Sequence, residues 1–237
     1  MKKNLVVLSG AGISAESGIK TFRDSDGLWE NYNVEDVASI DGWYRNPELM
    51  TQFYNQRRSE LGRTQPNDAH KIIAELEQYF NVTVVTQNVD NLHERGGSHN
   101  IIHLHGELTK VCSENGKKCV EDIGYETYDY GRKSADGHIT RPFIVWFGED
   151  VPLLGKAAEA VEQADILIVI GTSLNVYPAA GLLFSARPSC KIYLIDPKEV
   201  NTTSRVEFIQ KKATEGMRML KEKLLAELSS MENRKTR

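Results

Sequence analysis

Four residues near the middle of the chain have side chains that could bind and deprotonate a sugar-containing ligand. Gln87, Asn88 and Asp90 offer two amides and a carboxylate, which can hydrogen-bond ribose hydroxyls and a carboxamide. His105 stands directly before Gly106, which leaves room for a ligand beside the imidazole. Because the pKa of free imidazole is about 6.5, neutral histidine can accept a hydroxyl proton at neutral pH. The alternatives are that His105 is structural and that the amides only cap a helix.

A glycine-rich turn near the N-terminus indicates a phosphate-bearing ligand. Residues 5–8 form an apolar run that leads into Gly10, Gly12 and Ala15, in a G-x-G-x-x-A pattern. Glycines there let the backbone turn tightly and approach a pyrophosphate, and the N-terminus of a following helix presents free N–H groups to it. We therefore predict a dinucleotide site, with a plain strand-to-helix turn as the alternative.

The segment after this turn argues against an ordinary dehydrogenase. Such enzymes carry a second apolar strand that ends in an acidic residue about twenty positions later. Residues 19–29 form a polar loop instead. Simple hydride transfer is therefore disfavoured.

The elements that must position these residues are typical of a parallel sheet covered by helices. The apolar runs are nearly continuous, as in strands buried on both faces. They span residues 5–8, 82–85, 166–170 and 192–195. Helical patterns over residues 68–76 and 157–164 alternate with them. The sequence thus predicts an α/β fold, a doubly wound parallel sheet of the Rossmann-like type, with ligands at the carboxyl ends of its strands.

Two stretches depart from this alternation and predict a smaller lobe. Residues 24–63 are polar with scattered aromatics, and residues 109–141 are rich in Gly, Lys and Tyr without a clear period. A cleft between the sheet and this lobe is the expected ligand site. The predicted domains are a Rossmann-like domain, residues 1–30, 64–108 and 142–237, and a small lobe, residues 31–63 and 109–141.

Composition limits the class of protein. With 237 residues and a net charge of −4, the chain has the size of one compact enzyme unit and no basic footprint for nucleic acid. The apolar stretch near the N-terminus is too short for a secretory signal or a membrane span. Three cysteines, an odd number, argue against a disulfide scaffold and fit a reducing compartment. We expect a cytoplasmic monomer with no nucleic-acid or membrane partner.

Four segments resemble, in order, the motifs of the sirtuin family of NAD-dependent protein-lysine deacylases. They are residues 10–19, 86–93, 103–108 and 171–173, and the match covers nearly the whole chain. The resemblance implies that NAD is consumed as a cosubstrate and that acyl-lysine proteins or peptides are the partners. The products would be nicotinamide, free lysine and O-acyl-ADP-ribose. It also implies that His105, the histidine directly before glycine, is the catalytic base.

The resemblance assigns many residues of the sheet edge to NAD. It implies that Asp90 holds the nicotinamide amide, with Asn88 and Gln87 around the nicotinamide ribose. Asp196, which ends the last apolar strand, would accept from the adenosine ribose hydroxyls, although sirtuins commonly carry Asn near this position. Ala213 would lie near the adenine, with a role as filler as the alternative. The predicted NAD-binding residues are Gly10, Ala11, Gly12, Ile13, Ser14, Glu16, Thr21, Phe22, Arg23, Gln87, Asn88, Asp90, Gly171, Thr172, Ser173, Asp196 and Ala213.

The resemblance also predicts an acyl-lysine site. Residues 143–149 resemble the substrate loop of sirtuins, whose exposed backbone pairs with an extended peptide; the alternative is a core strand. Tyr54 and Arg57 look like the Tyr-x-x-Arg pair of sirtuins that accept succinyl- or malonyl-lysine, because arginine binds a terminal carboxylate. Ala38 leaves space for a longer acyl chain, whereas the alternative for Arg57 is a solvated side chain. The predicted substrate residues are Ala38, Tyr54, Arg57, Val145, Trp146, Phe147 and Gly148.

Two further histidines, His93 and His103, are predicted to be structural or peripheral. The short apolar run of Ile101 and Ile102 predicts a strand that leads to His105. His103 lies two residues before His105, and we expect it on the opposite face of this strand.

The cysteine spacing predicts no metal site. Many sirtuins hold a structural zinc ion with two Cys-x-x-Cys pairs. Here Cys112 and Cys119 are too far apart for such a pair, and Cys190 lies in the sheet region. We expect the small lobe to pack without zinc, through tyrosines instead. These are Tyr125, Tyr128 and Tyr130.

Two other functions fit the same cleft. One is mono-ADP-ribosyl transfer, in which another nucleophile captures the ribosyl group. The other is a non-enzymatic sensor of NAD or ADP-ribose. The joint presence of Asn88, Asp90 and His105 argues against the sensor, because binding alone needs no base.

Overall fold

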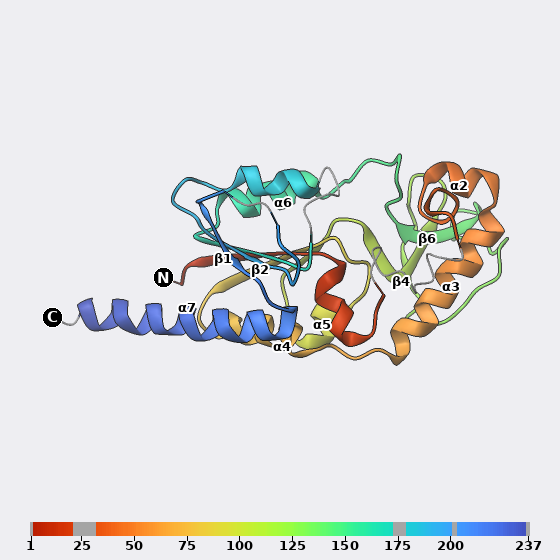
Figure 1. The fold of residues 1–237 in the computed structure, drawn as a ribbon. Helices are drawn as coiled ribbons and strands as arrows, with labels where there is room; N and C mark the ends of the chain where they lie inside the picture. The colour runs from red at the N-terminus through yellow and green to blue at the C-terminus, as the bar shows by residue number, and fades with distance from the viewer. Residues whose placement is uncertain (1, 21–31, 173–178, 201–202, 236–237) are drawn as a thin grey trace.

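A computed structural model gives the fold and describes residues 2–20, 32–172, 179–200 and 203–235 (Figure 1). The strands are β1 (Asn4–Ser9), β2 (Asn81–Thr86), β3 (Ile101–His103), β4 (Gly106–Ser113), β5 (Glu121–Asp122), β6 (Thr140–Ile144), β7 (Ile166–Ile170), β8 (Lys191–Ile195) and β9 (Val206–Ile209). The α-helices are α1 (Val34–Val37), α2 (Ile40–Arg45), α3 (Pro47–Arg63), α4 (Asp68–Glu75), α5 (Leu92–Gly96), α6 (Leu154–Glu162) and α7 (Ala213–Lys235). Short 3-10 helices are η1 (Ala11–Ser17), η3 (Leu76–Gln78) and η4 (Ala179–Ser185).

The larger sheet has six parallel strands in the order β3-β2-β1-β7-β8-β9. The chain builds β1, β2 and β3 outward to one edge, then returns to the middle and builds β7, β8 and β9 to the other. The strand order therefore reverses beside β1, and in such sheets the crevice at the carboxyl ends of the strands at that point binds the ligand. The predicted fold class is confirmed.

Both faces of this sheet are covered, which is why its strands are apolar without alternation. Leu5 and Val7 pack into one core cluster with α4 and α7, whereas Val6 and Leu8 pack into another with α6 and η4. Figure 1 shows α4 and α7 on one side of the sheet and α6 on the other. Strands sandwiched in this way have no solvent face to carry polar residues.

A second, three-stranded antiparallel sheet, β5-β4-β6, lies with α2 and α3 at the end of the molecule remote from both termini (Figure 1). A third core cluster joins this sheet to α1, α2 and α3, and contains Trp43, Phe53, Tyr54 and Trp146. We call this part the small lobe. The domain boundaries stay a prediction; β4 and β6 of the small sheet each cross one of them.

Two elements differ from the sequence-based expectation. β9 follows β8, so Asp196 does not end the last strand of the sheet. Residues 206–209 are half-buried or exposed at the sheet edge, and they therefore lack the continuous apolar run of the central strands. Helix α7 lies outside the two predicted helical patterns, begins at Ala213 and contains Gly216. A Cβ on Gly216 would lie 2.4 Å from the Ile195 side chain, so the helix needs glycine to approach β8.

Within the described residues, no helix is both long enough and apolar enough to cross a membrane.

Candidate functional site

Two glycine loops pack against each other at the carboxyl ends of β1 and β7, where the strand order places the expected ligand crevice. The Gly10 N–H donates to the Ile170 carbonyl at 3.0 Å, and the Gly12 N–H donates to the Gly171 carbonyl at 2.8 Å. A Cβ on Gly12 would lie 2.7 Å from Gly171 Cα, and one on Gly171 would lie 2.2 Å from the Ile13 nitrogen. Gly171 also has a φ of +63°, which favours glycine. The backbone contact between the loops therefore requires these glycines.

The helix expected after this turn is the 3-10 helix η1. Ser14 and Ile13 of η1 are both fully buried. The side chain of Ile13 belongs to the core between the sheet and α4, so only its backbone is available to a ligand.

A buried polar cluster joins η1 to the loop after β2. Asp90 accepts a hydrogen bond from the Ser14 hydroxyl at 3.0 Å and from the Leu92 N–H at 3.1 Å. The Asn88 amide donates to the Gly10 carbonyl and to the Ser14 hydroxyl, each at 3.2 Å. Burial raises the pKa of Asp90, although these hydrogen bonds oppose the shift. The structure thus brings together four of the predicted residues, Gly10, Ser14, Asn88 and Asp90.

His105 lies in the turn between β3 and β4, and its ring is oriented by the same loop. Its Nδ1 is 3.0 Å from the Gln87 carbonyl oxygen. A carbonyl can only accept, so Nδ1 carries the proton and Nε2 keeps its lone pair. Burial lowers the pKa of His105, partly offset by the hydrogen bond to Gln87. The half-buried ring is therefore neutral at neutral pH, as a general base must be.

The remaining polar residues line the same sheet edge on the β7–β8 side. The Gln87 amide donates to the Thr172 hydroxyl at 3.2 Å, which connects the loops after β2 and β7. Asp196 directly follows β8, is 5% exposed and accepts from the Lys198 N–H at 2.9 Å. Ala213 is buried at the start of α7.

Some predicted residues lie elsewhere or outside the described residues. Glu16 is exposed, and its carboxylate accepts from both the N–H and the hydroxyl of Thr214, each at 2.9 Å, in the first turn of α7. Ala11 is half-buried within η1. The predicted residues that lie outside the described part of the chain are Thr21, Phe22, Arg23 and Ser173.

The predicted acyl site lies on α3. Asn46 caps this helix by accepting from the Leu49 N–H. Tyr54 and Arg57 are one helical turn apart, as the spacing predicts. The buried Tyr54 hydroxyl accepts from the Trp146 indole N–H at 2.8 Å, and burial raises its pKa to about 12, partly opposed by the charge of Arg57. Arg57 is half-buried, and its guanidinium carbon is 5.7 Å from the Phe53 ring centroid.

The first two residues of the predicted substrate loop, Phe143 and Ile144, belong to β6, and residues 145–149 follow the strand. Trp146 is buried, whereas the Phe147 side chain is 52% exposed. The expectation of an exposed backbone is wrong at Phe147. Its N–H donates to the Ala38 carbonyl and its carbonyl accepts from the Ile40 N–H, each at 2.9 Å. A peptide strand that paired at Phe147 would have to replace these two bonds. The Val145 N–H donates to the His105 carbonyl at 2.9 Å, which ties the loop to the histidine turn.

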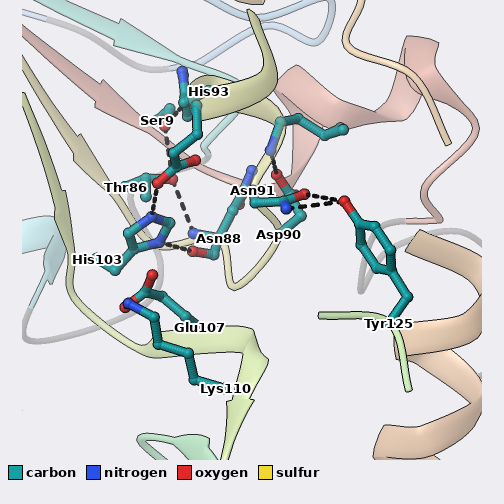
Figure 2. A network of polar contacts seen from close by, with 12 residues as sticks. Ser9, Thr86, Asn88, Asp90, Asn91, His93, His103, Glu107, Lys110 and Tyr125 are labelled. Atoms are coloured by element: carbon teal, nitrogen blue, oxygen red, sulfur yellow. Dashed lines mark hydrogen bonds and ion pairs between the residues drawn. The ribbon is translucent and has the colours of Figure 1, made fainter. Parts of the chain in front are cut away.

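The sequence reasoning missed a buried network beneath the crevice, and Figure 2 shows its residues. The Ser9 hydroxyl donates to Thr86 at 2.9 Å, and His93 Nε2 lies 2.9 Å from Ser9 Oγ. Thr86 in turn accepts from the Asn88 N–H at 3.0 Å. A hydroxyl side chain as the last residue of both β1 and β2 was the available signal.

His103 corrects another expectation. It does not point to the opposite side from His105, because its Nδ1 lies 3.1 Å from the Asn88 carbonyl, on the loop that His105 also contacts. Residues two apart in a strand share a face, and His103 ends β3.

The two cysteines of the small lobe differ in their exposure to solvent. Cys112 is buried and Cys119 is exposed. Burial raises the pKa of Cys112 to about 11, with Arg141 and Lys117 opposing the shift, so it is a neutral thiol. Among the tyrosines predicted to hold the lobe, Tyr128 is buried, while Tyr125 and Tyr130 are about 40% exposed.

Comparisons with known proteins agree on one family. The sequence profile of the Sir2 family matches residues 10–178. An NAD-dependent protein deacylase of Bacteroides thetaiotaomicron is 56% identical over 230 residues, covering 94% of this chain and 98% of the relative. An NAD-dependent protein deacylase of Helicobacter pylori is 52% identical over 225 residues, covering 94% and 98%. A solved Sir2 homolog–NAD complex is 38% identical with a TM-score of 0.85, over 96% of this chain and 91% of the other. A Sir2 homologue mutant with ADP-ribose is 39% identical with a TM-score of 0.87, over 96% and 94%.

Proposed function

The chain belongs to the Sir2 family, the sirtuins, and from this premise we propose that it removes succinyl and malonyl groups, as well as acetyl groups, from protein lysines. The coarser activity, NAD-dependent deacylation of proteins, is that of its relatives at more than half identity. The proposal concerns which acyl groups the site accepts and which residues act.

The donors and acceptors of the crevice suit NAD. Its diphosphate matches the backbone of the two glycine loops, and its carboxamide matches the buried Asp90 carboxylate, which is held by Ser14. Asn88 and Gln87 are placed for one ribose, and the buried Asp196 carboxylate for the hydroxyls of the other. When bound, NAD supplies a ribosyl carbon from which nicotinamide departs.

His105 acts as the base in this proposal. Its Nδ1–H is fixed on the Gln87 carbonyl, so that Nε2 can take the proton of a ribose hydroxyl. General-base catalysis of this kind contributes about 10²–10⁴-fold to the rate. Burial lowers the pKa of His105, so its neutral base form is still present at a pH where free imidazole is already protonated.

The observation that carries the acyl preference is the placement of Arg57 one turn from Tyr54. The Tyr54 oxygen already accepts from Trp146, so its own O–H is available to donate to an incoming carboxylate. The guanidinium offers charge-assisted hydrogen bonds to the same carboxylate. An acetyl group has no terminal carboxylate, so Arg57 should matter for succinyl- and malonyl-lysine but not for acetyl-lysine.

The test is nicotinamide release from NAD with matched acetyl- and succinyl-lysine peptides. We expect His105→Ala to abolish peptide-dependent release with both peptides. Arg57→Met should lower kcat/KM for the succinyl peptide by about tenfold to a hundredfold, as for loss of a charged hydrogen bond, and leave the acetyl peptide nearly unchanged. Arg63→Met, at an exposed arginine of the same helix, is the control.

Unchanged succinyl turnover in Arg57→Met would contradict the acyl preference but not the deacylase. No release with any peptide would contradict both, and would favour transfer of ADP-ribose to another nucleophile, visible as labelled NAD retained on protein.

We further propose that the small lobe needs no zinc. Support comes from Cys112, which is a buried neutral thiol, and from Cys119, which is exposed. The sequence contains no Cys-x-x-Cys pair. Metal analysis of the purified protein should find less than one equivalent of zinc, and a full equivalent would contradict the proposal.

A further inference from the structure

Two histidines hold two consecutive carbonyls of the loop that carries the nicotinamide-side residues. His105 Nδ1 lies 3.0 Å from the Gln87 carbonyl, and His103 Nδ1 lies 3.1 Å from the Asn88 carbonyl. Figure 2 shows the His103 ring directed at Asn88. Both imidazoles therefore fix the backbone from which the Gln87 and Asn88 side chains project.

His103 differs from His105 in its second contact. Its Nε2 lies 2.7 Å from the Glu94 carboxylate, while the ring is 9% exposed. The carbonyl on one side and the carboxylate on the other are both acceptors. Only an imidazolium, with a proton on each nitrogen, donates to both.

The charges around His103 favour this form. Six titratable groups surround His103 or its neighbours. They are His70 of α4, Asp90 of the loop before α5, His93 and Glu94 of α5, and Glu107 and Lys110 of β4. Burial opposes the charge, but the hydrogen bond to Glu94 and the charges of Glu94 and Glu107 raise the pKa of His103 above its ordinary value. His103 correspondingly lowers the pKa of Glu94.

The charges around His103 balance one another without an added ion. A ring nitrogen of His103 and one carboxylate oxygen from each of Glu94 and Glu107 lie within 4.8 Å of one another. Lys110 is 2.8 Å from Glu107, so an imidazolium and an ammonium meet the two carboxylates. His93 and His70 add no charge, because burial lowers the pKa of each.

We propose that His103 is a positioning residue for the deacylation reaction, which as an imidazolium holds the Asn88 carbonyl and so sets the Gln87 and Asn88 side chains for NAD. This inference rests on the proposed function of the crevice. A neutral His103 has only one N–H and can donate only one of its two hydrogen bonds. The charged Glu94 carboxylate is the stronger acceptor, so the remaining proton lies on Nε2 and the Asn88 carbonyl loses its donor. The loop is then released from this side, although His105 still holds Gln87.

The two histidines give the reaction opposite limits in pH. His105 must be neutral, and because its pKa is lowered, activity falls only below the ordinary value of 6.5. His103 must be charged, and because its pKa is raised, its contribution is complete below 6.5 and is lost as the pH rises through the raised value. The active window should therefore extend to both sides of pH 6.5.

The experiment compares pH profiles of kcat/KM for NAD at saturating acetyl peptide. His103→Asn keeps a donor at the place of Nδ1 but cannot titrate, so it should retain most of the activity and lose the alkaline fall that His103 causes. His103→Leu removes the donor and should lower kcat/KM by about ten- to a hundredfold across the range, as expected for a displaced substrate-positioning group. Glu94→Gln should move the alkaline fall to lower pH.

The control is an exposed pair of the same type. His99 Nδ1 lies 2.7 Å from Glu77, with the histidine side chain 86% exposed. His99→Asn should keep the wild-type profile.

Nitrogen NMR of the histidine rings provides a readout that needs neither activity nor variants. We expect both nitrogens of His103 to be protonated at pH 6.5 in the wild-type protein. A neutral His103 at that pH, or a wild-type profile in His103→Leu, would overturn the inference. If wild type releases no nicotinamide with any peptide, the proposed function fails, whereas the NMR titration and the pH dependence of NAD binding still decide the state and role of His103.

Discussion

The sheet edge and the small lobe are held together by different interactions. At the sheet edge, close contacts of glycine backbones and hydrogen bonds between buried side chains set the geometry, as between Gly12 and Gly171 and between Ser14 and Asp90. In the small lobe, buried arginines do so. Arg58 is fully buried and its Nε donates to the Leu108 carbonyl at 2.7 Å. The first mode depends on close backbone approach, and the second on desolvated charge.

The substrate loop shows what charge contributes in the small lobe. Arg141 donates to both oxygens of Glu149, at 2.8 and 3.0 Å, and its guanidinium carbon is 3.6 Å from the Trp146 ring centroid. Lys117 adds a contact to Glu149 at 3.0 Å. Glu149 in turn accepts from the Trp146 N–H at 2.9 Å. A charged network thus positions a loop of the predicted substrate site.

The largest effect is expected at the glycine contact. Gly171→Ala would place a Cβ 2.2 Å from the Ile13 nitrogen at a φ of +63°, and neither backbone can move without separating β1 from β7. We expect a loss of about 5 kcal/mol or more in the free energy of unfolding, or failure to fold. Urea denaturation measures it.

Gly155→Ala is the matched control for that substitution. Gly155 is exposed in α6 with nothing near its Cβ position, so alanine should stabilise the helix by up to about 1 kcal/mol. Equal effects at the two glycines would refute the claim that the sheet edge depends on backbone approach.

The next effect tests the buried charges of the small lobe. Arg141→Met leaves Glu149 partly uncompensated, with side chains 4% and 13% exposed in the wild-type pair. We expect a destabilisation of about 3–5 kcal/mol and a higher KM for peptide, because the Trp146 N–H loses a fixed acceptor. Denaturation and peptide kinetics measure the two effects.

Arg132→Met removes an ion pair with Glu121 in the same lobe, where the side chains are 35% and 54% exposed. It should cost no more than about 1 kcal/mol. If Arg141→Met cost as little as Arg132→Met, burial of charge would not be what holds this lobe.

The contrast between close backbone contact at the sheet edge and buried charge in the small lobe also explains which features the sequence could predict. The central strands were predictable because sandwiched strands need continuous apolar runs, and the glycine turn because close approach restricts the residue type. The edge strand β9 was missed since its residues are not fully buried. Arg58 and Arg141 were missed because an arginine in a polar-looking stretch gives no sign that folding will bury it. The prediction for His103 was wrong because residues two apart in a strand share a face. Its partner Glu94 is far enough away along the chain that no local sequence pattern links the two residues.

At the border of the two regions, Tyr54→Phe should have an intermediate effect. It removes the acceptor of the buried Trp146 indole N–H, which should cost about 1–3 kcal/mol of stability. If the Tyr54 hydroxyl also contacts a terminal carboxylate, kcat/KM should fall more for succinyl than for acetyl peptide. Tyr44→Phe, at a tyrosine 76% exposed in the same lobe, should change neither quantity.

The smallest effect is expected at Glu16, where the resemblance and the geometry predict different roles. Its carboxylate caps the first turn of α7 through the Thr214 N–H and hydroxyl, so Glu16→Ala should destabilise the protein by about 1 kcal/mol. Glu16→Gln, which keeps an acceptor, should cost less. Because the carboxylate is directed at α7, we expect the KM for NAD to be unchanged in both variants. A raised KM in Glu16→Gln, with stability preserved, would instead assign Glu16 to NAD binding and extend the cofactor site beyond the buried residues of the sheet edge.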